Sequence, residues 1–277
     1  MNILQGIIIG IVQGLTEFLP VSSSAHLIFI QKLLGVESSL AFSTFLHLGT
    51  LLAVLWFFRA DVYKLIKAWW LTIDDLLQRR FMEGLYEDVY KRLSWFVILA
   101  TIPVAIIGLL FESHVDALFA GALYAPAFFL FVTGTILYLS QRFASGEIDM
   151  SNLGWFQSLF MGLGQACAIL PGLSRSGTTI AAGLVAGLDK EFAAKFSFIL
   201  SIPAIFGAFI VQFKDIGTAI GADSAAVLLG FIAAFISGYL AIKWLLDLIQ
   251  NKSLDIFALY CWIVGIVVFV GSIANVF

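Results

Sequence analysis

Two short polar segments interrupt an otherwise apolar chain, and their residue types could bind an anion and attack it. The first, QGLTEFLPVSSSAH (13–26), contains Glu17, three consecutive serines and His26. The second, PGLSRSGTT (171–179), contains Arg175 among hydroxyl side chains. Ionisable groups inside long apolar stretches are energetically expensive, so they are functional candidates by default.

The second segment has the features of an anion site. Its glycines permit close approach to the backbone, and its serines are good N-caps for a following helix. A helix N-terminus offers free N–H groups to an anion, and the planar fork of Arg175 suits phosphate oxygens. The alternative is an arginine that only pairs with Glu17 and holds the two segments together. The predicted binding residues here are Gly172, Ser174, Ser176 and Thr178.

Glu17 has three possible roles in the first segment. It could hold a divalent cation, because Mg²⁺ and Ca²⁺ prefer oxygen ligands, it could orient His26, or it could act as a base. Gln13 lies four residues earlier, so a helix would place its amide on the same face. A simple ion pair between Glu17 and Arg175 is the competing interpretation.

His26 follows Ser22 and Ser23 by four and three residues, so a helix that resumes there would bring a hydroxyl near the imidazole. Histidine can take a proton from a serine or a water, or give one to a leaving oxygen. The alternative is a histidine that only stabilises the local fold. His47, inside an apolar run, and His114 are weaker candidates.

Together these groups match the needs of phosphoryl transfer: a cationic cradle, a nucleophile and an acid or base. A site at membrane depth implies a substrate with a lipid tail. The sequence has no GxxxxGK[ST] loop, so ATP is not expected. The predicted catalytic residues are His26, Ser23, Glu17 and Arg175, with Glu17 also the metal ligand and Gln13, Ser22 and Ser24 as further substrate contacts.

Composition indicates a membrane protein. Of 277 residues, 61% are hydrophobic and 12% charged, whereas soluble domains carry about 25% charged residues. No basic stripe suggests nucleic acid. We predict an all-α polytopic fold in a single membrane domain, 1–277. Six uncharged runs are long enough to span a bilayer: 42–58, 93–111, 117–139, 196–213, 224–242 and 256–277.

Two further apolar regions, 1–34 and 153–188, have polar centres and a proline at the break, Pro20 or Pro171. Irregular backbone at membrane depth persists only where protein or a wet cavity surrounds it. We therefore predict two re-entrant helix–loop–helix hairpins in addition to the six transmembrane helices.

The chain also repeats itself. LQGIIIGIVQG (4–14) aligns with FQSLFMGLGQA (156–166) at a constant offset, with matching Gln, Gly and Gln positions. Chance similarity between apolar helices is the alternative. Each half, 1–140 or 153–277, would contain one hairpin and three spans, and three is odd, so the second half must be inverted.

Charge supports this layout. Seven of the basic residues lie in 59–92, which the positive-inside rule makes a cytoplasmic loop. Both termini are then extracytoplasmic.

At this point the two polar segments resemble the signatures of the undecaprenyl-diphosphate phosphatase family, also called the bacitracin resistance family, and the likeness covers nearly the whole chain. The resemblance implies that His26 is the family's histidine, Ser23 its candidate nucleophile and Arg175 its phosphate-binding arginine. Gln13 stands where other members have a second carboxylate.

The resemblance further implies a bacterial inner-membrane enzyme that hydrolyses undecaprenyl pyrophosphate to undecaprenyl phosphate and inorganic phosphate, with Mg²⁺ or Ca²⁺. This reaction recycles the lipid carrier for peptidoglycan synthesis, supports cell shape and confers bacitracin resistance.

Three other classes of protein remain alternatives. A polyprenyl phosphate transporter would also use inverted repeats, but it has no need of a Ser23/His26 pair. An intramembrane serine protease would show GxSG, whereas Arg175 follows Ser174 here. A structural protein would not need buried His, Glu and Arg together. The sequence leaves open the nucleophile, the side of access, the lipid length and the oligomeric state.

Overall fold

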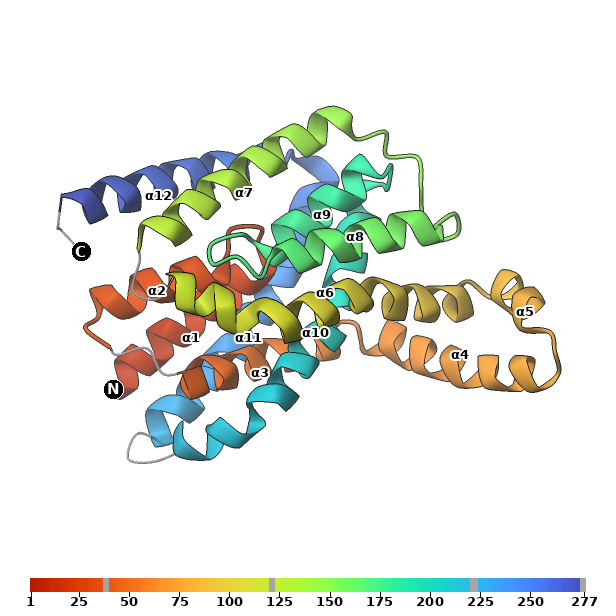
Figure 1. Ribbon diagram of the computed structural model, residues 1–277, viewed down its shortest axis with the longest axis horizontal. Coiled ribbons are helices and arrows are strands. Elements are labelled where there is room, and N and C mark those ends of the chain that lie inside the picture. The colour runs from red at the N-terminus through yellow and green to blue at the C-terminus, as the bar shows by residue number, and fades with distance from the viewer. Residues whose placement is uncertain (37–39, 120–122, 220–223, 275–277) are drawn as a thin grey trace.

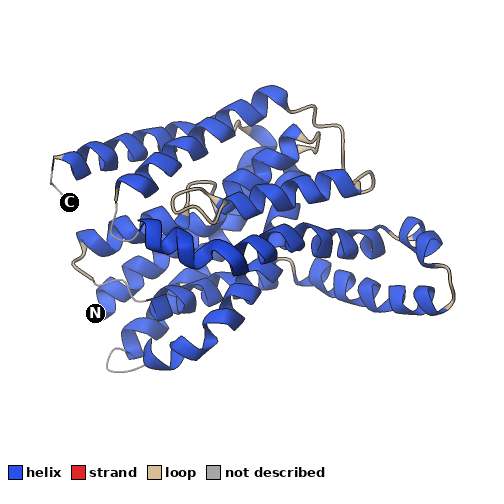
Figure 2. Cartoon of the chain, viewed as in Figure 1, coloured by secondary structure: helices blue, strands red, loops and turns tan. Residues whose placement is uncertain are grey.

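The computed structural model describes residues 1–36, 40–119, 123–219 and 224–274. Within these ranges the chain is helical (Figure 2), and its one β-type contact is an isolated bridge between Ile148 and Leu188. The helices, in chain order, are α1 (Ile3–Phe18), α2 (Ser23–Leu33), α3 (Leu40–Phe57), α4 (Arg59–Leu77), α5 (Phe81–Glu87), α6 (Val89–Phe119), α7 (Tyr124–Phe143), α8 (Trp155–Cys167), α9 (Arg175–Val185), α10 (Lys190–Ala219), α11 (Ser224–Asn251) and α12 (Asp255–Ile273).

Five described helices are long and apolar enough to cross a membrane, namely α7, α11, α12 and the segments Val89–Phe111 of α6 and Lys190–Gln212 of α10. The pair formed by α3 and α4, bent by 82°, makes up to six. This confirms the all-helical, polytopic membrane fold. The predicted loop 59–92 is itself mostly helical, because it contains α4, α5 and the start of α6.

Both predicted breaks are present. Between α1 and α2 the chain leaves the helix at residues 19–22, and between α8 and α9 it does so at 168–174. Pro20 and Pro171 lie in these breaks, where a proline lacks the N–H that a continuing helix needs. The helix–loop–helix form is therefore confirmed, whereas entry of the two hairpins from opposite membrane faces stays a prediction.

Each broken helix pair packs against the other half of the chain. A Cβ at Gly10 of α1 would lie 2.1 Å from the carbonyl oxygen of Gly230 in α11. A Cβ at Gly162 of α8 would lie 2.3 Å from that of Ala100 in α6. Small residues allow helices in a membrane to approach this closely. The two glycines occupy matching positions in the predicted repeat. In both cases a glycine lets a helix of one half pack closely on a helix of the other half.

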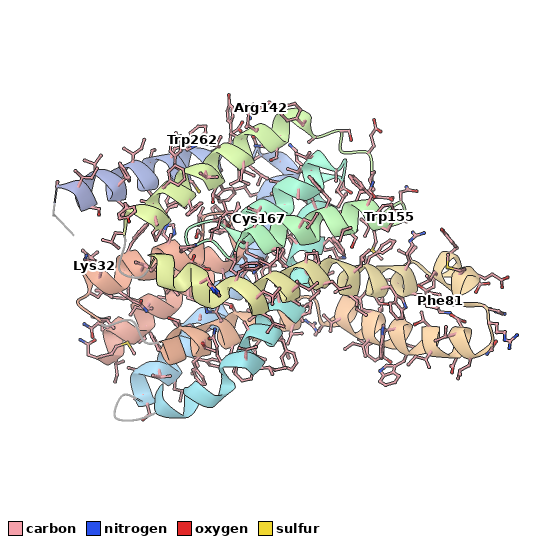
Figure 3. All side chains as sticks on the ribbon, in the orientation of Figure 1. Lys32, Phe81, Arg142, Trp155, Cys167 and Trp262 are labelled. Carbon is pink, nitrogen blue, oxygen red and sulfur yellow. The ribbon has the colours of Figure 1, made fainter. Side chains whose placement is uncertain are left out.

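The segments rich in basic residues share one end of the molecule. Lys195 lies 3.3 Å from Asp61, and Arg142 lies 2.8 Å from Asp255. Figure 3 shows Phe81 and Lys32 at opposite ends of the molecule. The excess of basic residues on the cytoplasmic side, and the side of the membrane on which each end lies, stay predictions.

The close contact of α1 with α11 predicts that Gly10→Ala destabilises the protein. The new methyl group must push two backbones apart, which typically costs about 1–3 kcal/mol. We expect a lower thermal midpoint in detergent.

The matched control is Gly207→Ala in α10, where no described atom outside the local helix backbone lies within 4 Å of the added Cβ. Alanine favours helix there by about 1 kcal/mol, so the midpoint should hold or rise. Equal midpoints for the two variants would contradict the proposed role of the contact.

Candidate active site

The two helix breaks meet near the centre of the molecule. The N–H of Gly172 donates to Ser24 Oγ at 3.4 Å, and Ser176 Oγ donates to the carbonyl of Leu19 at 3.0 Å. Figure 1 shows the red α1–α2 loop beside the green α8–α9 loop. The two polar segments therefore come together in the folded chain.

Local capping positions the first segment. Ser22 is the N-cap of α2, and its side chain accepts from the N–H of Ala25 at 3.4 Å. Its φ of +68° lies in the left-handed region that non-glycine residues rarely adopt. Such backbone persists only where its surroundings hold it. The turn makes Ser23 the first helical residue and directs its hydroxyl to Glu17, at the end of α1.

Thr133 of α7 holds the second segment in place through two hydrogen bonds to its backbone. Its hydroxyl donates to the carbonyl of Gly172 at 3.3 Å and accepts from the N–H of Ser174 at 3.0 Å. Gly172 has a φ of +96°, and a Cβ there would lie 2.3 Å from the carbonyl oxygen of Pro126, so only glycine fits. Ser174 then caps α9, which makes Arg175 its first residue.

Glu17 is the hub of the site, although its residue surface is only 7% exposed. Arg175 Nη2 donates to its Oε1 at 2.8 Å. Ser23 Oγ and Gln13 Nε2 donate to its Oε2 at 2.7 and 2.9 Å. His47 of α3 brings Nε2 to within 3.5 Å of the same oxygen. Four side chains from separate parts of the chain therefore surround one carboxylate.

A cavity of about 340 Å³ opens beside this cluster. Its polar wall consists of Glu17, Ser22, Ser23, Ser24, Ser43, Thr44, His47, Arg175 and Gln212. Its apolar wall consists of Ala168, Leu173, Ala204, Ile205, Ala208 and Phe209. The cavity therefore offers a charged, hydroxyl-rich surface and a lipid-like surface side by side.

Several residues that the sequence predicted as substrate contacts build the loops and do not line the cavity. Gln13 is fully buried behind Glu17. In the second segment Ser174 and Ser176 are each 1% exposed, and Thr178 donates to the carbonyl of Ser174 at 2.9 Å. Gly172 shapes the turn. The structure thus uses these polar groups for internal hydrogen bonds.

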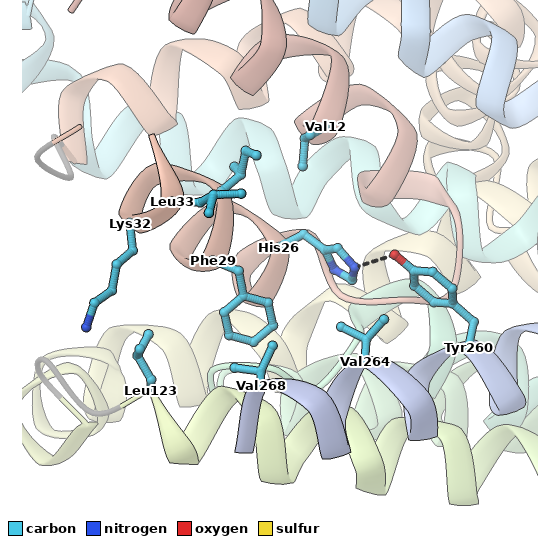
Figure 4. Close-up of a pocket in the computed structure, with 10 residues that line it drawn as sticks. Val12, His26, Phe29, Lys32, Leu33, Leu123, Tyr260, Val264 and Val268 are labelled. Carbon is cyan, nitrogen blue, oxygen red and sulfur yellow. Dashed lines mark hydrogen bonds between the residues drawn. The ribbon is translucent and has the colours of Figure 1, made fainter. Parts of the chain in front are cut away.

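His26 lies in a different cavity (Figure 4). Its Nδ1 lies 2.8 Å from the carbonyl of Ser22, and its Nε2 lies 2.8 Å from the hydroxyl of Tyr260, whose ring stacks on the imidazole. Apolar side chains such as Phe29, Val264 and Val268 line the rest of that cavity. The structure does not bring His26 together with Glu17, Ser23 and Arg175.

Sequence reasoning ranked His47 too low and did not single out Thr133. A usable signal existed for His47, because an imidazole within an otherwise uncharged span is as unusual as a buried carboxylate. Thr133 carried none, since a threonine in an apolar helix is commonplace.

The described residues do not fit a metal ion held by the protein alone. They contain no group of three His, Cys, Asp or Glu side chains that could hold one. Glu17 already accepts from Arg175, Ser23 and Gln13. The remaining neighbouring oxygen, Gln13 Oε1, is buried without a hydrogen-bond partner but does not line the cavity.

Comparison with known proteins gives a consistent result. The family model described as "Bacitracin resistance protein BacA" matches residues 6–267. A protein of Methanobrevibacter smithii named "Undecaprenyl-diphosphatase" is 75% identical over 277 residues, all of both chains. Proteins with the same name from Methanosphaera stadtmanae and Carboxydothermus hydrogenoformans are 46% identical over 99% of each chain and 39% identical over the whole of each.

The buried Glu17–Arg175 pair predicts a strong coupling between the two residues. Arg175→Met leaves a buried carboxylate without its cation, which typically costs about 3–5 kcal/mol. Adding Glu17→Gln removes the stranded charge, so the double variant should be more stable than Arg175→Met alone. Thermal midpoints of the two single variants and the double variant measure this coupling. Strictly additive losses would show that the two residues do not act as a pair.

Proposed function

The chain belongs to the family of the bacitracin resistance protein BacA, and from this premise we propose how its cavity acts as an undecaprenyl-diphosphatase. The protein is an integral-membrane hydrolase that converts undecaprenyl pyrophosphate to undecaprenyl phosphate and inorganic phosphate. Relatives with this name match it over their full lengths. The reaction returns the lipid carrier for cell-wall synthesis and removes the pyrophosphate form that bacitracin targets.

One observation carries the proposal: Arg175, Glu17 and Ser23 share a hydrogen-bonded cluster beside one cavity. The side chain of Arg175 is 16% exposed and lines the cavity, so part of its surface is open to phosphate oxygens. It stands at the first residue of α9, where the helix dipole also favours an anion. Binding and attack are therefore possible at the same place.

The nucleophile is Ser23 or a water in its place. Ser23 Oγ already donates to Glu17, so the carboxylate is positioned to take its proton while a new O–P bond forms at the terminal phosphorus. The bond from that phosphorus to the bridging oxygen breaks, and undecaprenyl phosphate leaves with the electron pair. If a phosphoserine forms, a water then cleaves it and Ser23 recovers its proton from Glu17.

A divalent cation in this site would be held mainly by phosphate oxygens of the substrate, because the described residues supply no site of their own. A pyrophosphate brings several negative charges into a site where Glu17 already offsets Arg175. Phosphate oxygens are good ligands for Mg²⁺ and Ca²⁺, and such ions usually reach phosphoryl-transfer sites partly through the substrate. A cation bound to the pyrophosphate would supply the missing positive charge.

The apolar wall of the cavity supports a lipid substrate. Ala204, Ala208 and Phe209 belong to α10, one of the helices able to span the membrane. A polyprenyl chain could lie along these residues while its pyrophosphate meets Arg175. Orientation in the cell membrane follows the positive-inside rule, with both termini extracytoplasmic and the basic end of the molecule in the cytoplasm.

Phosphate release from undecaprenyl pyrophosphate by the purified protein in detergent tests the function. We expect release that EDTA abolishes and that added Mg²⁺ or Ca²⁺ restores. A folded protein that binds the lipid but releases no phosphate would overturn the hydrolase and favour transport of polyprenyl phosphates.

Substitutions of Arg175 test the anion site. Arg175→Ala should lower turnover about 10³-fold or more, the scale at which arginines stabilise phosphoryl transfer. Arg175→Lys should recover little, because an ammonium lacks the planar fork. The matched control, Arg142→Ala, changes an exposed arginine paired with Asp255 and should retain activity. Near-normal turnover by Arg175→Lys would argue against the bidentate role.

A further inference from the structure

His47 is an unexplained polar residue of the active site. It lies within α3, a helix that contains no Asp, Glu, Lys or Arg, and its side chain is 34% exposed. It lines the same cavity as Glu17, Ser23 and Arg175. A histidine at membrane depth is costly unless it has a function.

The orientation of the imidazole is fixed from one side. His47 Nδ1 lies 2.7 Å from the carbonyl oxygen of Ser43. A carbonyl can only accept, so Nδ1 carries a hydrogen, and whenever the ring is neutral its acceptor nitrogen is Nε2. The same helix therefore anchors the ring and selects the tautomer that a proton acceptor needs.

The other ring nitrogen of His47, Nε2, faces the reacting groups. Nε2 lies 3.5 Å from Glu17 Oε2, which is longer than an ordinary hydrogen bond. Ser23 Oγ lies 2.7 Å from that same oxygen, so all three atoms border one small region. A water in this region could donate one hydrogen to Nε2 and the other to Glu17, which would leave a lone pair to point at phosphorus.

We propose that His47 is a catalytic residue of the phosphatase, whose Nε2 holds the attacking water and accepts its proton. The water oxygen bonds to phosphorus, and its proton moves to Nε2. The departing oxygen, either that of the lipid phosphate or Ser23 Oγ, keeps the electron pair of the broken bond. Water attacks phosphorus once in either route, so His47 is needed whichever nucleophile acts first. The proposal rests on the phosphatase function above.

His26 is poorly placed for this task. Both of its ring nitrogens already have partners, in Ser22 and Tyr260, and it lines the other cavity. The chain has three histidines, and the third, His114, is exposed and lines neither cavity. The same substitution can therefore be compared at three positions.

The test compares His47→Gln, His26→Gln and His114→Gln in the phosphate-release assay. His47→Gln should lower kcat about 10²- to 10³-fold, the usual contribution of a general base, and change KM less than about threefold. His114→Gln is the matched control and should match the wild type. The kcat of His47→Gln should fall at least tenfold below that of His26→Gln.

A second variant separates chemistry from misfolding. His47→Ala leaves room in the cavity, and added imidazole should restore part of its kcat, which a merely structural histidine would not allow. The proposal is overturned if His47→Gln keeps kcat within threefold of the wild type, if its loss lies in KM alone, if His26→Gln is the more damaged, or if imidazole fails to rescue a folded His47→Ala. If the wild type itself releases no phosphate, the phosphatase function fails instead.

Discussion

The ion pair between Glu17 and Arg175 is the interaction on which the rest of the site depends. Two opposite charges at membrane depth are tolerable only as partners with their remaining hydrogen bonds satisfied. The carboxylate stands at the end of one broken helix and the guanidinium at the start of another. Their attraction therefore fixes the distance between two loops that come from different halves of the chain, and Ser23 and His47 are arranged around the result.

Most of the polar residues in the two loops form internal hydrogen bonds that stabilise the loops and do not contact a ligand. Backbone that leaves a helix inside a membrane must find internal partners for its N–H and C=O groups. Thr133 and Ser174 provide them for the second loop and the start of α9, and Ser176 provides one for Leu19 of the first loop. This leaves a small reactive surface of Glu17, Ser23, His47 and Arg175, which is held by a much larger buried scaffold.

The sequence predicted the features that depend on composition and on local chemistry. Hydropathy indicated the spans, prolines and polar runs indicated the breaks, and the expense of isolated charges singled out Glu17 and Arg175, whose pairing was the alternative interpretation. It did not predict the surroundings of the histidines, because these are set by distant helices. The hydroxyl of Tyr260 in α12, 234 positions away in the sequence, is hydrogen-bonded to the ring of His26. The packing of α3 brings His47 to Glu17. Neither contact follows from spacing along one segment.

The packing of α1, early in the chain, on α11, late in the chain, has a consequence for the order in which the protein folds. Gly6, Gly10 and Gly14 of α1 pack on α11, which a ribosome delivers some two hundred residues later. Helix α1 is made first but can complete its packing only after α11, nearly the last helix, has been made. Domains generally fold in the order of synthesis, but here α1 of the first half needs α11 of the second half to complete its packing. The reactive cluster is thus completed late, because Glu17 lacks its Arg175 partner until α9 has been made.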